Sequence, residues 1–351
     1  MLKGFVKRVT DWKHWSFYLF YFPLSFAWVG YYIKARSLWY YTASNPTITF
    51  GGFEGEGKSE MYQQLPAHLC PRTVILEPHL PISEVLKRVE EAGLTYPFIV
   101  KPDVGMKGIL FRKITSEHQL KQYHQQMPAT YLAQEFLNTP YEVSVFYCRM
   151  PDSAKGQITA MIQKNLLEVT GDGVSTLEEI IQRQDYARSW LPKIRKEQPE
   201  KLHQILADGE RFYLSHVANL YHGARFINLT SKVTHRLAEV FDAISLQNQF
   251  LYGRYDIKCS SIEDMLEGRN FYILEFNGSG SVPNHIFTGD YSLVGAYKEI
   301  LRHWKTLYAI STANNRKGID YWGFRKGYAF LQQSKRHFKD LKKLDKELVL
   351  S

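Results

Sequence analysis

Two short segments late in the chain carry residue types that can bind a metal ion and a nucleotide. One reads Gly-Arg-Tyr-Asp and ends at Asp256, and the other reads Leu-Glu-Phe-Asn and ends at Asn277. Asp256, Glu275 and Asn277 supply the hard oxygen ligands that suit Mg²⁺, which leaves its other positions to water and phosphate. Arg254 beside them would face the same phosphates or a developing negative charge. The pattern predicts a metal and nucleotide site.

Strands must position these side chains. Both segments are rich in β-branched and aromatic residues, and turn-forming residues 267–270 lie between them, which predicts two paired strands. Alternate residues of a strand share a face, so Arg254 is expected to project with Asp256, and Glu275 with Asn277. The alternative is a hairpin whose acids point into solvent, as carboxylates on strands usually do.

Length, charge and composition set wide limits on the size of the core and on the kind of partner. The chain has 351 residues and a net charge of +9, with 44% hydrophobic and 15% aromatic residues. That length can bury one large core or two to three smaller ones. The positive charge favours an anionic partner such as a nucleotide, a nucleic acid or an acidic membrane. Cys70, Cys148 and Cys259 show no metal-ligand spacing, which favours a reducing, cytosolic setting.

From about residue 73 the sequence alternates strand-like and helix-like segments. A serine cap begins the second helix, and residues 182–210 are charged and mostly helical by pattern. The mixture predicts an α+β fold. The expected strands are residues 73–76, 97–100, 108–114, 131–136 and 143–148, and the expected helices are residues 81–92, residues 116–126 and a segment that begins at Thr176.

A second group of residues is suited to phosphates. Lys101 follows the strand predicted at residues 97–100, and a loop with Gly105 and Gly108 comes next. A lysine at this place can reach phosphates, and glycine lets backbone N–H groups approach them closely. Further along, a predicted strand ends in Gln-Glu-Phe at residues 134–136.

In this order, the motifs resemble the ATP-grasp superfamily, in particular its D-alanine:D-alanine ligase-like and cyanophycin-synthetase-like carboxylate-amine ligases. The resemblance covers roughly residues 73–305 and implies an α+β fold in which two subdomains clasp ATP. It implies that Lys101 and Arg254 act in catalysis and that Mg²⁺, or Mn²⁺, is bound by Asp256, Glu275 and Asn277. The implied ATP contacts are Lys101, the loop glycines Gly105 and Gly108, the adenine hinge Gln134, Glu135 and Phe136, the ribose contact Glu142, and Lys164.

The substrate side is less defined. Gly-Asp-Gly at residues 171–173 is similar to a turn of the cyanophycin-synthetase-like ligases. By the same resemblance, the substrate contacts would be Asn219, Gly223, Arg225, Gly278 and Ser279, with ordinary loop or core positions as the alternative. The chain departs from the family after Asn277, where residues 278–285 replace the usual Asn-Thr-x-Pro-Gly. ATP binding is therefore better supported than any particular amino-acid substrate.

Residues 52–59, Gly-Phe-Glu-Gly-Glu-Gly-Lys-Ser, satisfy the P-loop pattern and follow strand-like residues 47–50. Glu54 and Glu56, however, would stand where backbone amides must cradle phosphate, and Pro66 leaves only a short helix. We expect this loop to belong to the substrate side of the cleft. A P-loop ATPase or kinase remains the alternative.

Residues 16–33 form an uncharged run rich in aromatic residues, at the lower limit of about 17–25 residues for a membrane span. Pro23 and the aromatic composition favour a kinked helix that lies in, or dips into, one leaflet. A single span and a buried aromatic helix are alternatives. The basic and aromatic tail after residue 312 suits anionic lipid, or equally a helix packed by its aromatic face.

The sequence thus predicts an ADP-forming ligase that joins a carboxylate to an amine or thiol through an acyl-phosphate, with ATP and Mg²⁺ as cofactors. The expected units are a membrane-associated segment (1–45), a glycine-rich loop region (46–72), the ATP-grasp domain (73–311) and a basic tail (312–351). The expected location is the inner face of the cell membrane, with a lipid-linked substrate as one option and no nucleic acid as a partner. A non-catalytic membrane-associated nucleotide-binding protein is a further alternative.

Overall fold

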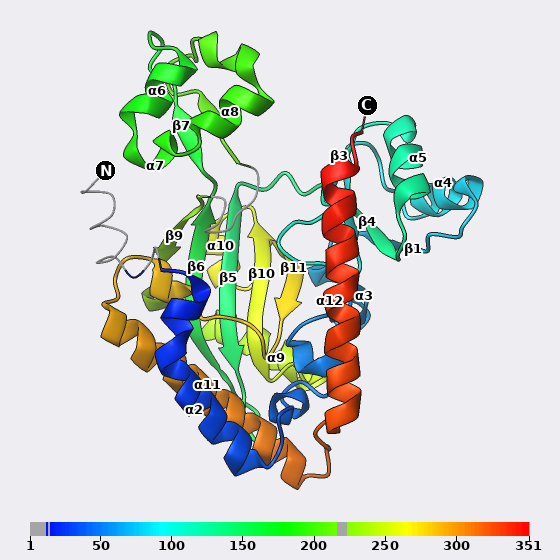
Figure 1. The fold of residues 1–351 in the computed structure, drawn as a ribbon, viewed down its shortest axis with the longest axis vertical. Coiled ribbons are helices and arrows are strands. Elements are labelled where there is room, and N and C mark those ends of the chain that lie inside the picture. Colours follow the sequence, from blue (N-terminus) through cyan, green and yellow to red (C-terminus); the bar gives the residue numbers. More distant parts are fainter. Residues whose placement is uncertain (1–11, 13–14, 216–222, 351) are drawn as a thin grey trace.

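The computed structural model describes residues 12, 15–215 and 223–350. Its strands form a sheet of four, a sheet of five and a sheet of two, each antiparallel throughout. Figure 1 shows the large sheet at the centre, the four-stranded unit on its upper right and a small helical lobe above. The prediction of an α+β fold is confirmed.

The four-stranded sheet has the order β1-β4-β2-β3. Its strands are β1 (Thr73–Leu76), β4 (Tyr131–Glu135), β2 (Phe98–Pro102) and β3 (Arg112–Ile114). Helices α4 (Ile82–Glu91) and α5 (Glu117–Gln126) supply Val85, Leu120 and Tyr123 to the core of this unit. The predicted serine cap is confirmed, because Ser116 Oγ accepts from the backbone N–H of Gln119.

The five-stranded sheet has the order β11-β10-β5-β6-β9. Helix α9 (His235–Asn248) contributes Phe241 and Ile244 to the core on one face. On the opposite face, Phe146 and Tyr252 join an aromatic cluster with Leu307 and Ile310. The strands are β11 (Phe271–Asn277), β10 (Tyr252–Cys259), β5 (Tyr141–Cys148), β6 (Gln157–Asn165) and β9 (Arg225–Asn228).

The small lobe has a core of its own that includes Val169, Ile180 and Ile194. A capping box of Thr176 and Glu179 begins its first helix, as the sequence predicts. The lobe consists of β7 (Glu168–Thr170), β8 (Arg211–Tyr213), α6 (Leu177–Arg183), α7 (Asp185–Arg188), α8 (Leu191–Glu197) and a 3₁₀ turn at Pro199–His203.

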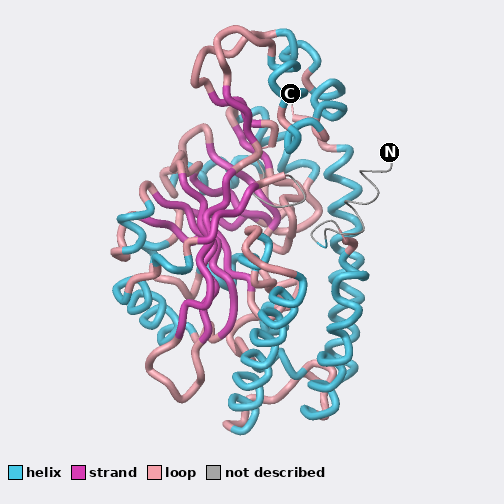
Figure 2. Tube along the Cα trace, turned by 90° about the vertical axis from the view of Figure 1, so that its left-hand side faces the viewer, coloured by secondary structure: helices cyan, strands magenta, loops and turns pink. Residues whose placement is uncertain are grey.

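Three longer helices lie outside the sheets: α2 (Phe17–Ala35), α11 (Leu293–Arg316) and α12 (Phe324–Glu347). Figure 2 shows the strands in the middle of the molecule and long helices along one side. Helices α2 and α11 lie side by side, whereas α12 runs past the large sheet to the four-stranded unit. Phe330 of α12 packs on the aromatic cluster and Leu341 enters the core of the four-stranded unit.

Some predicted boundaries are wrong for identifiable reasons. The strand predicted at 108–114 shrinks to β3 because Lys107, Gly108 and Leu110 have φ values of 55°, 75° and 55°. Residues 47–50 are not a strand, since a 3₁₀ turn occupies Thr49–Gly52. A short helix, α10 (Ile262–Leu266), precedes the turn expected between β10 and β11.

Helix α2 has two different faces. Phe20 and Leu24 are buried on the side that packs with Ile300 of α11, and Pro23 lies inside the helix. Within the described residues, no helix combines the length and the apolar character that a membrane crossing requires.

Candidate active site

The candidate site is a small cleft of about 60 Å³ between the two main sheets. Lys101 and the loop with Gly105 and Gly108 line it from the four-stranded sheet, and Glu275 lines it from β11. The other charged residues that line it are Lys107 of the same loop and Lys58, from the short helix α3 (Lys58–Tyr62). The structure therefore brings together the lysine, the glycine loop and one of the acids predicted from sequence.

Lys101 stands on β2 with its ammonium held by uncharged partners. Its Nζ donates to Gln134 Oε1 at 3.0 Å and lies 3.4 Å from the hydroxyl of Tyr62. Burial, followed by the nearby charge of Lys58, lowers the pKa of Lys101 to about 7. A bound phosphate would give the Lys101 ammonium a negatively charged partner.

Lys58 comes from the segment that matches the P-loop pattern. Ser59 directs it inward, because its backbone N–H and hydroxyl donate to Asp103 at 2.7 and 2.8 Å. Lys58 Nζ donates to the carbonyl of Gly105 at 3.0 Å and lies 3.7 Å from Glu275 Oε1. Asp103 thus occupies the Ser59 groups that would cradle phosphate in a P-loop, and Lys58 serves the same cleft as Lys101.

The predicted pairing of β10 with β11 is confirmed. Arg254 stands opposite Asn277 and Asp256 opposite Glu275, with a register shift after Asp256. Cross-strand partners and alternate residues share a face, so all four side chains start from the same face of the sheet. The alternative, in which the acids point into solvent, does not hold for Asp256, which is 7% exposed.

Asp256 sits in a compact network of charges. Arg254 Nε and Nη2 donate to its two oxygens at 3.2 and 3.3 Å, Lys164 Nζ lies 2.9 Å from Oδ1, and Ser144 Oγ also donates to Oδ1. Burial alone would raise the pKa of Asp256, but Arg254 and Lys164 together hold that pKa well below its usual range. The carboxylate is therefore ionised at any physiological pH.

The predicted metal ligands have suitable chemistry, although positive charges already compensate their carboxylates. Asp256 is ionised, Glu275 faces Lys58, and the side chain of Asn277 lies 3.5 Å from Asp256 Oδ2. In the described part of the chain, no cluster of three or more His, Cys, Asp or Glu residues could hold a metal ion. A divalent cation here therefore needs the amide oxygen of Asn277 and phosphate oxygens in addition to the carboxylates.

The segment after Asn277 replaces the family's usual motif, and the structure shows what it contacts. The backbone N–H groups of Ser279 and Gly280 donate to the carbonyls of Gly51 and Gly52 at 3.0 and 3.1 Å. The two glycine loops lie so close that a Cβ added at Gly278 would come within 2.8 Å of the Gly52 Cα. Gly278 and Ser279, predicted as substrate contacts, are here part of this backbone packing.

Asn284 holds Arg254 in place. In the amide orientation that satisfies both of its ends, its side-chain oxygen accepts from Arg254 Nη1 at 2.8 Å. Arg254 is thereby held between Asp256 and Asn284. Asn284 was not singled out in the sequence, because its spacing from Asn277 matches no motif.

The side chains predicted to contact adenine and ribose already have partners within the protein. The Gln134 amide is occupied by Lys101, the Tyr62 hydroxyl and Thr73 Oγ1. The other residues predicted to contact adenine or ribose each have a cationic partner. Glu135 pairs with Arg72 at 2.9 Å, and Glu142 pairs with Lys164 at 3.1 Å. Phe136 lies under Lys113, whose Nζ is 4.3 Å from the centre of the ring.

Two further predicted substrate contacts, Gly223 and Arg225, do not line the cleft. Gly223 has a φ of 76° and packs against Leu167 and Trp190 of the small lobe. The guanidinium of Arg225, on the edge strand β9, lies 5.5 Å above the ring of Tyr186. Asn219 lies outside the described residues. Gly223 and Arg225 therefore lie where the small lobe meets the large sheet.

The sequence analysis placed the loop at residues 52–59 on the substrate side of the cleft, but it assigned no role in a ligase to Lys58 or to the half-buried acid Glu56. Burial, with the like charge of Glu275, raises the pKa of Glu56 to about 7. Its Oε2 has no hydrogen-bond partner among the described residues. The signal for Lys58 was the Gly-Lys-Ser motif itself, whose lysine lines the cleft while its serine is held by Asp103.

Comparison with known proteins gives distant structural likenesses only. No family model matches the sequence, and no curated protein matches it. The chain is similar to D-alanine–D-alanine ligase from Bacillus anthracis (TM-score 0.40, 13% identity, 74% of this chain and 69% of that one). It is also similar to a bifunctional glutathione synthetase from Pasteurella multocida (0.40, 14%, 70% and 36%) and to the ATP-grasp ligase PsnB (0.39, 14%, 72% and 58%).

These are proteins of the class that the sequence motifs resemble. The chain spans 36% of the glutathione synthetase and 58% of PsnB, so much of each lies outside the match. The TM-scores are near 0.4 and the identities are 13–14%, so neither the fold nor the chemistry of this chain is inferred from these proteins.

Proposed function

We propose that the chain is an ATP- and Mg²⁺-dependent ligase that joins a carboxylate to an amine or thiol through an acyl-phosphate. The observation that supports this most is the convergence of Lys58, Lys101 and the Gly105–Gly108 loop in one cleft with Glu275. Arg254 and Asp256 lie on the same sheet face as Glu275. This arrangement supports a site in which the lysines bind phosphates and the acids bind a metal ion.

The chemistry needs charge stabilisation more than proton transfer. A carboxylate oxygen attacks the γ-phosphorus of ATP, ADP leaves, and the amine then displaces phosphate from the acyl-phosphate to form the amide. Lys101 and Lys58 would bind the phosphates, and Arg254, fixed by Asp256 and Asn284, would face the negative charge of the intermediate. Mg²⁺ bound by Asp256, Glu275 and Asn277 would supply further neutralisation of phosphate charge.

ADP formation tests this proposal. We expect ADP release that requires both a carboxylate and an amine, measured in a screen of paired substrates with lipid extract included. Arg254→Gln should abolish turnover while ATP binding remains, because the guanidinium faces the intermediate. ATP turnover that is indifferent to every carboxylate would exclude a ligase, and ATP binding without turnover would identify a non-catalytic nucleotide-binding protein.

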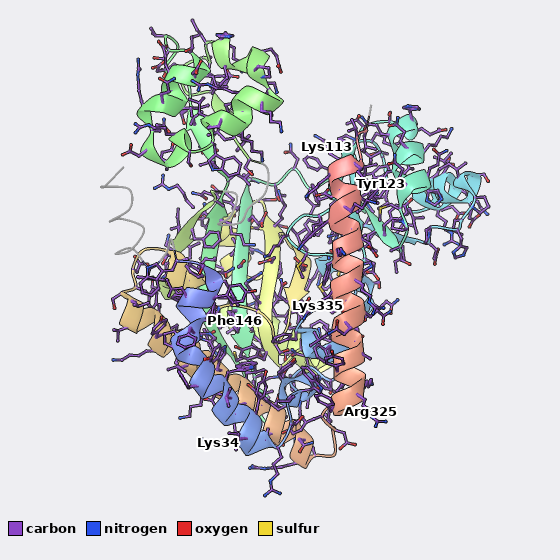
Figure 3. The ribbon with its side chains drawn as sticks, viewed as in Figure 1. Lys34, Lys113, Tyr123, Phe146, Arg325 and Lys335 are labelled. Carbon is purple, nitrogen blue, oxygen red and sulfur yellow. The ribbon has the colours of Figure 1, made fainter. Side chains whose placement is uncertain are left out.

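We also propose that the enzyme works at an anionic membrane surface, with α2 as the contact. One face of α2 is exposed and apolar: Phe22, Phe26 and Ile33 are 67%, 71% and 71% exposed. They follow one another at spacings of four and seven residues, so they share one side of the helix. The basic Lys34, which Figure 3 shows at the lower end of α2, and Arg36 would meet lipid phosphates.

Vesicle flotation tests the membrane contact. We expect the full chain to float with vesicles that contain phosphatidylserine, and a Phe22→Ser, Phe26→Ser, Ile33→Ser triple variant to remain in the soluble fraction. Phe111→Ser, at an exposed aromatic position away from α2, is the matched control. Equal flotation of the triple variant and the control would contradict a role for α2.

A further inference from the structure

A groove of about 480 Å³ lies along α12, separate from the small cleft. It is lined on one side by a row of lysines and on the other by Glu54 and Met106. The lysines stand at intervals of three, four and one residues on one side of the helix, and all of them are exposed. They are Lys335, Lys339, Lys342, Lys343 and Lys346.

The lysine row is not neutralised by the protein. Among the described residues, none of these lysines has an ion-pair partner within the structure. Asp345, another acid of α12, is occupied by Arg112 at 2.9 Å and by the backbone N–H of Leu110. Glu347 is the one acid of α12 that lines the groove. The groove thus has a strong excess of positive charge.

Contacts with the glycine loop fix the groove next to the cleft. His337 of α12 bonds the carbonyl of Val104 at 2.9 Å, just before Gly105. Gly55, across the groove, lies so close to α12 that a Cβ there would come within 2.5 Å of Ser334 Oγ. Met106 lines both the groove and the cleft, so the two spaces meet at this residue. A molecule in the groove can therefore extend toward Lys101.

We propose that the lysine groove binds an acidic peptide, a chain with several carboxylates, and directs its reacting end into the cleft. The inference rests on the proposed ligase function, because it assigns the class of the carboxylate substrate. From Lys335 to Lys346 the helix advances about 16 Å at roughly 1.5 Å per residue. About five residues of extended peptide, at roughly 3.3 Å each, cover this length.

A peptide fits this groove better than a membrane does. The surface is hollowed, and its two apolar lining residues are Phe338, which is 5% exposed, and the half-buried Met106, so the groove has no exposed apolar face of the kind that α2 has. The exposed aromatic residues of α12, Phe324 and Tyr328, lie at its other end. Figure 3 places Lys335 near the middle of α12 and Arg325 near its lower end, which separates the two surfaces.

Fluorescence anisotropy of a labelled hexaglutamate peptide with the full chain tests this. We expect binding that weakens as salt rises, and at least tenfold weaker binding for Lys339→Glu with Lys343→Glu. Arg325→Glu with Lys326→Glu makes the same charge change on the same helix outside the groove, and should bind the peptide as the wild type does. Melting temperature verifies that each variant is folded, and Lys→Gln versions replace any that is not.

Two further arms separate the possible results. Any of three results would overturn the inference. The control variant could lose as much peptide binding as the groove variant, or tripolyphosphate could bind more tightly than hexaglutamate. The third is that the groove lysines are needed to bind anionic vesicles and not to bind the peptide. A labelled ATP analogue is titrated in parallel. If the groove variants lose peptide binding and keep ATP binding, the peptide site in the groove is confirmed. If Lys101→Ala loses ATP binding and keeps peptide binding, the result concerns the proposed ATP site in the cleft alone.

Discussion

The ammonium of Lys164 lies 2.9 Å from Oδ1 of Asp256, so a predicted metal ligand is already paired with a buried cation. Arg254 holds the same carboxylate at 3.2 Å. A divalent cation that approaches Asp256 meets these two positive charges, unless phosphates arrive with it to compensate them. The metal and the nucleotide are therefore expected to bind together.

Titration calorimetry with Mg²⁺ checks this expectation. We expect binding of Mg²⁺ alone to be in the millimolar range or weaker, and to strengthen at least tenfold with a non-hydrolysable ATP analogue present. Asp256→Asn should remove most of that gain. Tight Mg²⁺ binding to the nucleotide-free chain would contradict the charge balance described for Asp256.

Lys164 is expected to stabilise the fold as well as the site. Lys164→Met leaves the buried Asp256 and the adjacent Glu142 with less compensation, and breaking a buried ion pair costs about 3–5 kcal/mol. Urea unfolding measures the change. Lys155→Met, at an exposed position, should change the free energy of unfolding by less than about 0.5 kcal/mol. Equal effects of the two substitutions would show that the Lys164 network contributes little.

ATP affinity should fall as pH rises above 7. The pKa of Lys101 is lowered to about 7 by burial and by Lys58, so above this pH the free protein holds a neutral amine. Phosphates favour the charged form, so nucleotide binding takes up a proton, and the affinity falls by up to about tenfold per pH unit. Lys101→Arg stays charged throughout and should bind ATP with little pH dependence.

Binding isotherms at pH 6, 7, 8 and 9 give the result for both proteins. Calorimetry in two buffers of different ionisation enthalpy counts the proton directly. A flat pH profile for the wild type, or the same slope for Lys101→Arg, would show that Lys101 does not carry the effect.

Glu56→Gln should stabilise the protein at pH 8 and have little effect at pH 4. The folded pKa of Glu56 is raised to about 7, so between its ordinary value and 7 the folded state holds more protons than the unfolded state. Stability contributed by this group therefore falls as pH rises through that window. At about 1.4 kcal/mol per pKa unit, reduced by partial contact with water, the gain at pH 8 is about 1–3 kcal/mol.

Thermal unfolding at the two pH values measures this gain. Glu60→Gln is an informative comparison, because Glu60 accepts hydrogen bonds from the backbone N–H and the hydroxyl of Thr49 at 2.8 and 2.7 Å. This substitution should destabilise the protein. If Glu56→Gln destabilises at pH 8, the carboxylate has a partner that offsets its burial.

Local pattern was sufficient where one physical rule dominated. Alternation placed Arg254 and Asp256 on a single face, and the capping chemistry of Ser116 and Thr176 began helices at the predicted residues. These signals act over a few residues, so the sequence carries them openly.

Contacts between distant segments could not be foreseen in the same way. The hydrogen bond between Gly51 and Ser279 joins backbone groups, which leave no side-chain pattern in the sequence. This contact helps to place the P-loop-like segment beside the cleft between the two sheets. Lys58 reaches Glu275 only because Asp103 anchors Ser59. The groove along α12 likewise needs both the helix and the loop at Met106, which are far apart in the chain.

Oxygen transfer from substrate to phosphate tests the central claim most directly. With a carboxylate labelled with ¹⁸O, an acyl-phosphate route predicts that one labelled oxygen appears in the phosphate released with ADP, and that Arg254→Gln releases none. Mass spectrometry of the phosphate measures it. Phosphate whose new oxygen comes only from water, at an unchanged rate of ADP formation, would contradict carboxylate activation and leave a simple ATPase.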